Sequence, residues 1–156
     1  MILEIKKHPD PILKKRALEI KELNEEVKSL AKDMIETMTE KDGVGLAGPQ
    51  VGEGRRIVVV MTQEGPQVFL NPKIVSKSKE KELGEEGCLS LPDLFLKINR
   101  FKEVEVEALN LSGEKIKLQV KDFMARVFQH EIDHLDGILF IDRLSWRQKI
   151  WRRLNG

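Results

Sequence analysis

The chain has 156 residues, which is enough for one domain with a buried core that needs no disulfide. Apolar residues make up 40% and charged residues 34% of it, and the formal net charge is +1. This composition is typical of a soluble globular protein and gives no broad basic surface for DNA. The single cysteine excludes an intrachain disulfide, and no apolar run approaches the length of a membrane span. We expect one domain over residues 1–156, in the cytoplasm, with neither DNA nor a membrane as partner.

The first long element is predicted as a helix over residues 24–41. His8-Pro9-Asp10-Pro11, ahead of it, predicts an extended or turn segment, because residues before proline avoid helical geometry. Asn24 is a suitable N-cap, and Gly43 is a natural stop. The apolar residues follow the i, i+3, i+4 spacing of an amphipathic face: Val27, Leu30, Ala31, Met34, Ile35 and Met38.

A glycine-rich segment, Gly43-Val44-Gly45-Leu46-Ala47-Gly48-Pro49-Gln50, follows this helix. It contains the pattern GxGxxG, but the dinucleotide-binding fingerprint lies between a strand and a helix, whereas here a helix precedes it. The segment is not a P-loop either, since no Gly-Lys-Ser/Thr closes it. Two interpretations stay open: a tight connector from helix to strand, and a loop whose backbone groups approach a bound peptide.

Short buried strands are predicted over 57–61 and 68–70, with the second continuing through 74–75. Residues 76–82 are expected to form a charged, solvated loop. The lone cysteine, Cys88, follows in a segment that predicts a shaped turn and strand. A single cysteine in such a protein is commonly a buried small hydrophobe, but its setting, between a glycine and a nearby proline, favours a function.

Alternating apolar and charged residues predict a β-hairpin over residues 103–120, with its turn at Ser112-Gly113. Acidic positions of its first strand face basic positions of its second, which supports the pairing. Asp122 is a candidate cap for the next helix. The expected order of helix, strands, helix and helix predicts the α+β class. We expect a mostly antiparallel or mixed sheet packed around the central helix, with further helices at the N- and C-terminal ends.

That central helix carries His130-Glu131-Ile132-Asp133-His134, which has the pattern HExxH. Two imidazoles one turn apart on one face can bind a single metal ion, and Glu131 can then take a proton from a water on that ion. A histidine pair at this spacing can also be a solvated surface pair or core packing. No histidine or glutamate follows His134, so a third ligand has to lie upstream, where Cys88 is the only soft candidate.

A last amphipathic helix is predicted after Ser145, with Trp146, Ile150, Trp151 and Leu154 on one side. Residues 142–156 contain five basic residues and one acidic residue. We expect the apolar side to pack on the body of the protein and the basic side to face solvent. The alternative is that the basic side contacts RNA phosphates.

Three segments together, 43–50, Glu86-Gly87-Cys88-Leu89-Ser90 and 130–134, resemble in order and spacing the signature motifs of the peptide deformylases. Those enzymes remove the formyl group from the initiator methionine of new bacterial and organellar proteins. The resemblance runs across most of the chain and implies a metal-dependent hydrolase. One departure is Gly48, where the family usually has a second alanine; it removes no functional group, although it could loosen the loop.

The resemblance implies a role for each matching residue. Cys88, His130 and His134 would hold the metal and leave a fourth position for water. Glu131 would act as general base and then general acid. The Gln50 side-chain amide and the Leu89 backbone N–H would stabilise the oxyanion. The expected methionine pocket consists of Val44, Gly45, Phe123 and Val127. Supporting residues would be Asp133, expected to orient an imidazole, and an ion pair between Glu86 and Arg100.

The resemblance also implies a cofactor and partners. The family's physiological metal is Fe²⁺, and a thiolate with two imidazoles also accepts Zn²⁺, Co²⁺ or Ni²⁺. The substrate would be an N-formylmethionyl nascent peptide, and some members bind the ribosome through the C-terminal helix. Two alternatives remain: an HExxH metallopeptidase, which lacks its downstream ligand here, and a structural metal, for which only His8 is left as a fourth ligand.

Overall fold

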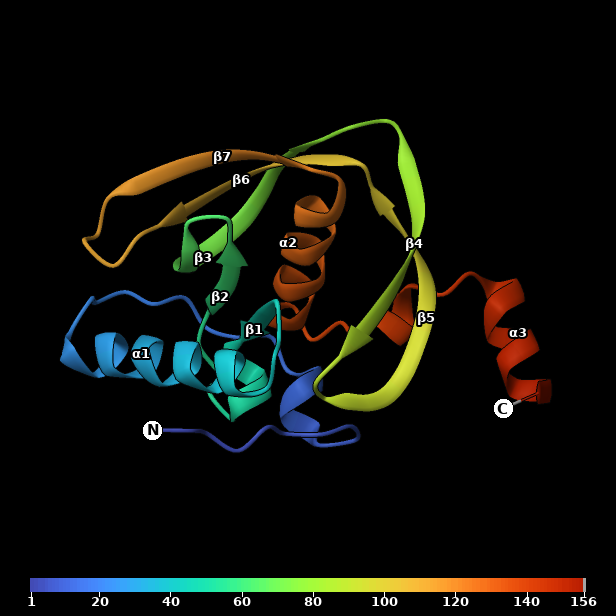
Figure 1. The fold of residues 1–156 in the computed structure, drawn as a ribbon, viewed down its shortest axis with the longest axis horizontal. Helices are drawn as coiled ribbons and strands as arrows, with labels where there is room; N and C mark the ends of the chain where they lie inside the picture. The colour runs from blue at the N-terminus through green and yellow to red at the C-terminus, as the bar shows by residue number, and fades with distance from the viewer. Residues whose placement is uncertain (156) are drawn as a thin grey trace.

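The computed structural model describes residues 1–155 (Figure 1). After a short 3₁₀ turn η1 (Pro11–Lys14), helix α1 (Glu25–Glu40) begins where the sequence predicted it. The side chain of Asn24 accepts a hydrogen bond from the Val27 N–H at 3.0 Å, so Asn24 is the N-cap. Val27, Ala31, Met34 and Met38 of the predicted face are buried, Leu30 and Ile35 are partly buried, and the polar Thr37 is buried as well.

The larger sheet has five strands in the order β1-β2-β3-β6-β7, and every neighbouring pair is antiparallel. Its strands are β1 (Gly45–Ala47), β2 (Ile57–Thr62), β3 (Gly65–Lys77), β6 (Glu103–Leu109) and β7 (Lys115–Lys121). The predicted hairpin is β6–β7, and Lys117 contacts Glu105 across it at 3.3 Å. The short 3₁₀ helix η2 (Gly48–Val51) follows β1 and completes the glycine-rich segment.

A second, two-stranded antiparallel sheet consists of β4 (Lys81–Cys88) and β5 (Leu91–Phe101). Leu89 and Ser90 form the turn between them, next to Cys88. The charged loop predicted over 76–82 is shorter than expected. Residues up to 77 still belong to β3 and β4 starts at 81, because their backbone groups pair with β6 and β5.

Helix α2 (Asp122–Leu135) lies in the centre of the molecule, between the larger sheet and the β4–β5 hairpin (Figure 1). Its apolar side packs on β2, β3 and β6 through residues such as Ala125 and Phe128, which is why the HExxH residues are buried. The predicted cap is wrong: Asp122 is the first helical residue, with a positive φ of 55°, and the N-cap position is Lys121. The hydrogen bonds at this corner come from the backbone, since the Asp122 N–H donates to Lys102.

The C-terminal part consists of η3 (Phe140–Arg143) and helix α3 (Trp146–Asn155), which extends away from the body (Figure 1). The predicted packing of α3 is wrong, because Trp146, Trp151 and Leu154 are 68%, 66% and 78% exposed. Phe140 and Leu144, just before α3, cover the apolar side of β5 instead. None of the helices in residues 1–155 is long and apolar enough to cross a membrane.

Candidate metal centre and active site

Three potential metal ligands converge from two elements. His130 and His134 lie one turn apart on α2, and Cys88 ends β4 beside the two-residue turn. One ligand atom from each residue lies within 4.8 Å of the others, and the Cys88 Sγ is 3.4 Å from the His134 Nε2. The exposed His8 is not part of this cluster, so the described residues provide three soft ligands and no closed four-ligand set.

The chemistry of this cluster fits a divalent cation. Burial is the main reason why the pKa of His134 lies well below its usual value, so this imidazole is neutral, as a ligand must be. Burial also lowers the pKa of His130, but the neighbouring Cys88, Glu131 and Glu86 outweigh it and raise that pKa to about 10. Such negative surroundings favour a bound cation as they favour a proton. A thiolate with two imidazoles is a donor set for Zn²⁺, Fe²⁺, Co²⁺ or Ni²⁺.

Glu86 orients one of the imidazoles. Its Oε1 lies 2.8 Å from the His130 Nδ1, which leaves the Nε2 of that ring for the metal side. Burial raises the pKa of Glu86, but hydrogen bonds from His130 and Arg100 outweigh it and lower the pKa to about 2. The carboxylate is therefore charged at neutral pH and holds the proton of His130 on Nδ1, so that the Nε2 proton is the one a metal ion would replace.

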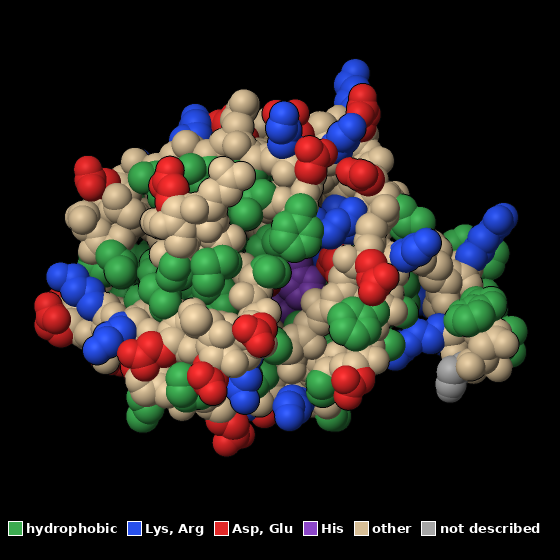
Figure 2. All heavy atoms as spheres, viewed as in Figure 1, with side chains coloured by type: hydrophobic (Ala, Val, Ile, Leu, Met, Phe, Trp, Pro, Cys, Tyr) green, Lys and Arg blue, Asp and Glu red, His purple; other side chains and the backbone are tan. Residues whose placement is uncertain are grey.

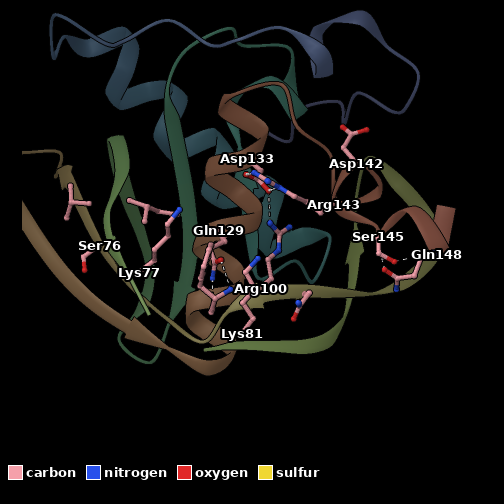
Figure 3. A pocket seen from close by; sticks show the side chains of 14 residues that line it. Ser76, Lys77, Lys81, Arg100, Gln129, Asp133, Asp142, Arg143, Ser145 and Gln148 are labelled. Carbon is pink, nitrogen blue, oxygen red and sulfur yellow. Dashed lines mark hydrogen bonds and ion pairs between the residues drawn. The ribbon is translucent and has the colours of Figure 1, made fainter. Parts of the chain in front are cut away.

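The predicted Glu86–Arg100 ion pair is present and continues into a buried network. Arg100 donates to Glu86 through Nε at 2.8 Å and Nη2 at 3.0 Å, and to Asp133 through Nη1 at 2.6 Å. Asp133 accepts a further pair of bonds from Arg143 (Figure 3). The prediction that Asp133 orients an imidazole is wrong, since its carboxylate faces two arginines and the imidazole partner is Glu86.

Glu131 lies beside the ligands and under the strand β1. It is 4% exposed, and burial is the main cause that raises its pKa to about 7. Its Oε1 is one of two buried side-chain oxygens or nitrogens with no hydrogen-bond partner in the described residues; the other is the His134 Nδ1. A Cβ on Gly45 would lie 2.6 Å from the Glu131 Oε2, so a glycine at this position lets β1 approach the carboxylate. A buried carboxylate with a pKa near neutrality is suited to accept and return a proton.

The side chain of Gln50 is held in one orientation. Its Oε1 accepts the Ala47 N–H at 3.0 Å, so its amide nitrogen points the other way, donating to the Ser90 Oγ at 3.2 Å and lying 3.5 Å from the Cys88 Sγ. Gln50 is 2% exposed. The glycine-rich segment is thus both a connector and a wall of the site, and the two interpretations of it are compatible.

A cavity of about 390 Å³ opens next to the ligands. In Figure 2 a histidine lies at the floor of a hollow whose edges carry hydrophobic side chains. The residues predicted for the methionine pocket all line it: Val44, Gly45, Phe123 and Val127. Gln50 and Leu89 line it as well. Val44 and Phe123 are partly exposed and belong to its rim.

Comparison with known proteins identifies the family. The family model described as polypeptide deformylase matches residues 2–149. The chain belongs to this family. A peptide deformylase of Dictyoglomus thermophilum is 50% identical over 143 residues, which are 92% of this chain and 93% of that one. A peptide deformylase of Pseudothermotoga lettingae is 48% identical over 142 residues, 91% of this chain and 82% of that one.

Solved peptide deformylase structures share the fold. The crystal structure of the Thermotoga maritima enzyme has a TM-score of 0.91 and 44% identity, and covers 93% of this chain and 99% of that one. The actinonin-bound class I type b peptide deformylase of Acinetobacter baumannii has a TM-score of 0.88 and 39% identity, with coverage of 93% and 99%. The predicted family and the predicted α+β fold are confirmed.

The structure also explains the one departure from the deformylase motif. A Cβ on Gly48 would lie 2.6 Å from the Arg55 carbonyl oxygen and 3.0 Å from that of Glu53. Glycine therefore permits a close backbone approach here, and the expectation of a looser loop does not follow. Phe95 and Arg126 also line the cavity, although neither was predicted as a site residue. Phe95 lies on β5 after the cysteine motif, and no spacing rule indicated that it would fold back over the site.

Proposed function

We propose that this chain removes the formyl group of N-formylmethionyl nascent peptides with Cys88, His130 and His134 as the ligands of one divalent metal ion. The activity itself, metal-dependent hydrolysis that releases formate, is that of the peptide deformylase family to which the chain belongs. The observation that carries the ligand assignment is the convergence of the three soft donor atoms beside a buried carboxylate. When bound, the ion would act as a Lewis acid and lower the pKa of a bound water, to roughly 7 in zinc hydrolases.

Glu131 is the proton carrier of the proposed mechanism. Its carboxylate takes a proton from the attacking water and then delivers it to the nitrogen of the departing methionine. The pKa of about 7 suits both halves of this transfer at neutral pH. The packing of Gly45 against the carboxylate restricts where its oxygens lie, so the proton is held at a defined point next to the ligands.

Gln50 and Leu89 would stabilise the negative charge on the formyl oxygen. The Ala47 N–H fixes the Gln50 amide so that its two N–H donors point toward the Cys88 side of the site. The Leu89 backbone lies in the turn that directly follows Cys88 and also lines the cavity. Donors that are already oriented need no reorganisation when the charge develops.

We expect Gln50→Ala to lower kcat on the order of 10²–10³, the range for loss of one oxyanion donor. Steady-state kinetics on an N-formylmethionyl peptide would measure this. A change confined to KM would instead show that the amide binds the substrate before the reaction and not the oxyanion. Ser90→Ala is the matched control. It removes the hydroxyl that accepts a hydrogen bond from the Gln50 amide, and it leaves the Gln50 amide itself in place.

The cavity accounts for the choice of substrate. Val44, Gly45, Phe123 and Val127 give apolar walls beside the ligands, which suit the thioether of methionine. A formyl hydrogen is the smallest acyl substituent, so a narrow space at the metal would exclude acetyl. The backbone of β1 pairs with β2 on one side only, and its open edge at Val44-Gly45 can pair with an extended peptide of varied sequence.

An HExxH metallopeptidase is the alternative use of the same helix. The two functions separate when the chain is given both an N-formylmethionyl peptide and casein. Our proposal expects formate from the peptide and no cleavage of casein, whereas casein hydrolysis without formate would support the peptidase. We also propose Fe²⁺ as the ion in the cell, with Zn²⁺, Ni²⁺ or Co²⁺ able to replace it. Metal analysis of anaerobically purified chain, with turnover measured on the same sample, tests that choice.

The remaining proposals concern where the chain works. Nascent formylmethionyl chains arise in the cytoplasm of bacteria, and we place the chain there. The basic side of α3 would contact ribosomal RNA near the point where such chains emerge. Its residues Arg147, Lys149, Arg152 and Arg153 have few acidic neighbours, and the helix extends away from the body. Contacts with phosphates would weaken steeply with salt.

Reversing the charge of Arg147, Arg152 and Arg153 together is expected to abolish co-sedimentation with ribosomes and to leave turnover of a free formyl peptide unchanged. Glutamate at the exposed Lys21, Lys28 and Lys32 gives a control with the same change in net charge on another face. Binding that survives the α3 changes, or that is lost equally in the control, would exclude α3 as the ribosome contact.

A further inference from the structure

Arg126 lines the cavity, yet its guanidinium is bound to the protein and not held free for a substrate. The residue lies on α2, one turn before His130, and its side chain is 11% exposed. The Nη1 donates to the Glu86 Oε2 at 2.8 Å and to the Ile98 carbonyl at 2.7 Å. The Nη2 donates to the Glu82 carbonyl at 2.6 Å. One side chain of α2 therefore binds both strands of the β4–β5 hairpin.

These bonds matter because the proposed metal ligands come from the same two elements. Cys88 belongs to β4, while His130 and His134 belong to α2. A ligand set divided between two elements keeps its spacing only if those elements are fixed to each other. The bonds from Arg126 to the backbone of β4 and β5 provide such a link, four residues before His130 and eight before His134.

Arg126 also completes the surroundings of Glu86. The Oε1 of this carboxylate accepts from His130 and from the Nη2 of Arg100, and its Oε2 accepts from the Nε of Arg100 and from Arg126. Two arginines thus hold both oxygens in place. The orientation of the carboxylate determines which nitrogen of His130 is left for a metal ion.

We propose that Arg126 is a positioning residue of the metal centre: it fixes Glu86 and holds the β4–β5 hairpin against α2, so that Cys88 and His130 stand at ligand spacing. The inference rests on the ligand set proposed above. It assigns to Arg126 an effect on metal affinity, which a residue that only contacts the substrate would not have.

Gly84 offers a way to disturb Arg126 without removing it. Gly84 lies on β4, and a Cβ there would lie 2.8 Å from the guanidinium carbon and 2.8 Å from the Nη2 of Arg126. A methyl group would therefore push the guanidinium off its acceptors. Gly54 is a matched control, because a Cβ at that position meets nothing within 4 Å.

The test measures affinity for Co²⁺ by competition with a chelator, together with the thiolate-to-cobalt absorption band. Arg126→Met and Gly84→Ala are each expected to weaken Co²⁺ binding by about 10–100-fold, the range for loss of a group that orients a ligand. Arg126→Lys keeps the positive charge but has fewer hydrogen-bond donors, so it should bind Co²⁺ more tightly than Arg126→Met and less tightly than the unaltered chain. Arg55→Met, which breaks an exposed contact with Glu26, and Gly54→Ala should bind Co²⁺ like the unaltered chain.

Combining Arg126→Met with Gly84→Ala should weaken binding no further than Arg126→Met alone, since both changes act on one guanidinium. Unchanged Co²⁺ affinity in both single variants, with a raised KM for the formyl peptide, would overturn the inference and make Arg126 a substrate contact. If Arg126→Met fails to fold by circular dichroism, Gly84→Ala decides. Failure of the unaltered chain to bind Co²⁺ would instead contradict the ligand set itself.

Discussion

Replacing Glu131 with alanine is expected to lower turnover of an N-formylmethionyl peptide by at least ~10²–10⁴ while the chain keeps its fold and its metal. The reason is that Glu131 is not itself one of the three converging ligands, and its carboxylate is the buried proton carrier beside them. The effect should fall on kcat, because the proton moves during the reaction and not during binding.

Steady-state kinetics with metal analysis of the same sample checks this result. Glu85→Ala is a useful comparison, since it removes a more exposed carboxylate from the wall of the same cavity and should change turnover by less than about tenfold. Near-normal turnover in the Glu131 variant would remove this residue from the mechanism. Loss of metal together with activity would show that Glu131 supports the ligands and is not the base.

Cys88→Ala is expected to release the metal ion and to lose activity with it. A thiolate contributes a strong, soft bond that two imidazoles alone do not replace, and its loss leaves two ligands on α2. Metal content after dialysis and formate release by the same sample measure both consequences. Leu91→Ala, at the pairing partner of Cys88 on β5, controls for disturbance of the hairpin.

A Cys88→Ala chain that keeps one metal ion and full activity would show that the ligand set is wrong. Cys88→Ser adds a graded step, because an oxygen ligand preserves the geometry and binds soft metals less tightly. Its metal content should lie between those of the alanine variant and the unaltered chain.

Much of the fold could be predicted from the sequence because its elements have clear periodicity. The apolar face of α1, the N-cap Asn24 and the alternation of β6–β7 each follow local rules that the structure obeys. The family could be recognised because three motifs occur in a fixed order, and each motif is a short contiguous segment. Such segments can be read directly from the sequence, so no knowledge of tertiary packing was needed.

What could not be predicted depends on the direction of side chains and on distant neighbours. Asp133 is three positions after His130, so helical spacing permitted an imidazole contact, but Arg100 of β5 and Arg143 lie closer. The prediction that α3 packs on the body was also wrong: Phe140 and Leu144, which precede α3, pack on β5, while the apolar side chains of α3 stay exposed. The contacts of Arg126 could not be predicted, since its partners are the Glu86 carboxylate and backbone carbonyls of β4 and β5, all of them distant in sequence.

The most direct test of the whole account is formate release from an N-formylmethionyl peptide as metal-free chain is titrated with Fe²⁺ under anaerobic conditions. Bound iron is measured in each sample. We expect no formate without metal, a rise in proportion to bound iron, and saturation at one ion per chain. Formate release by the metal-free chain, or none at any iron content, would contradict the proposed metal-dependent deformylation at this site.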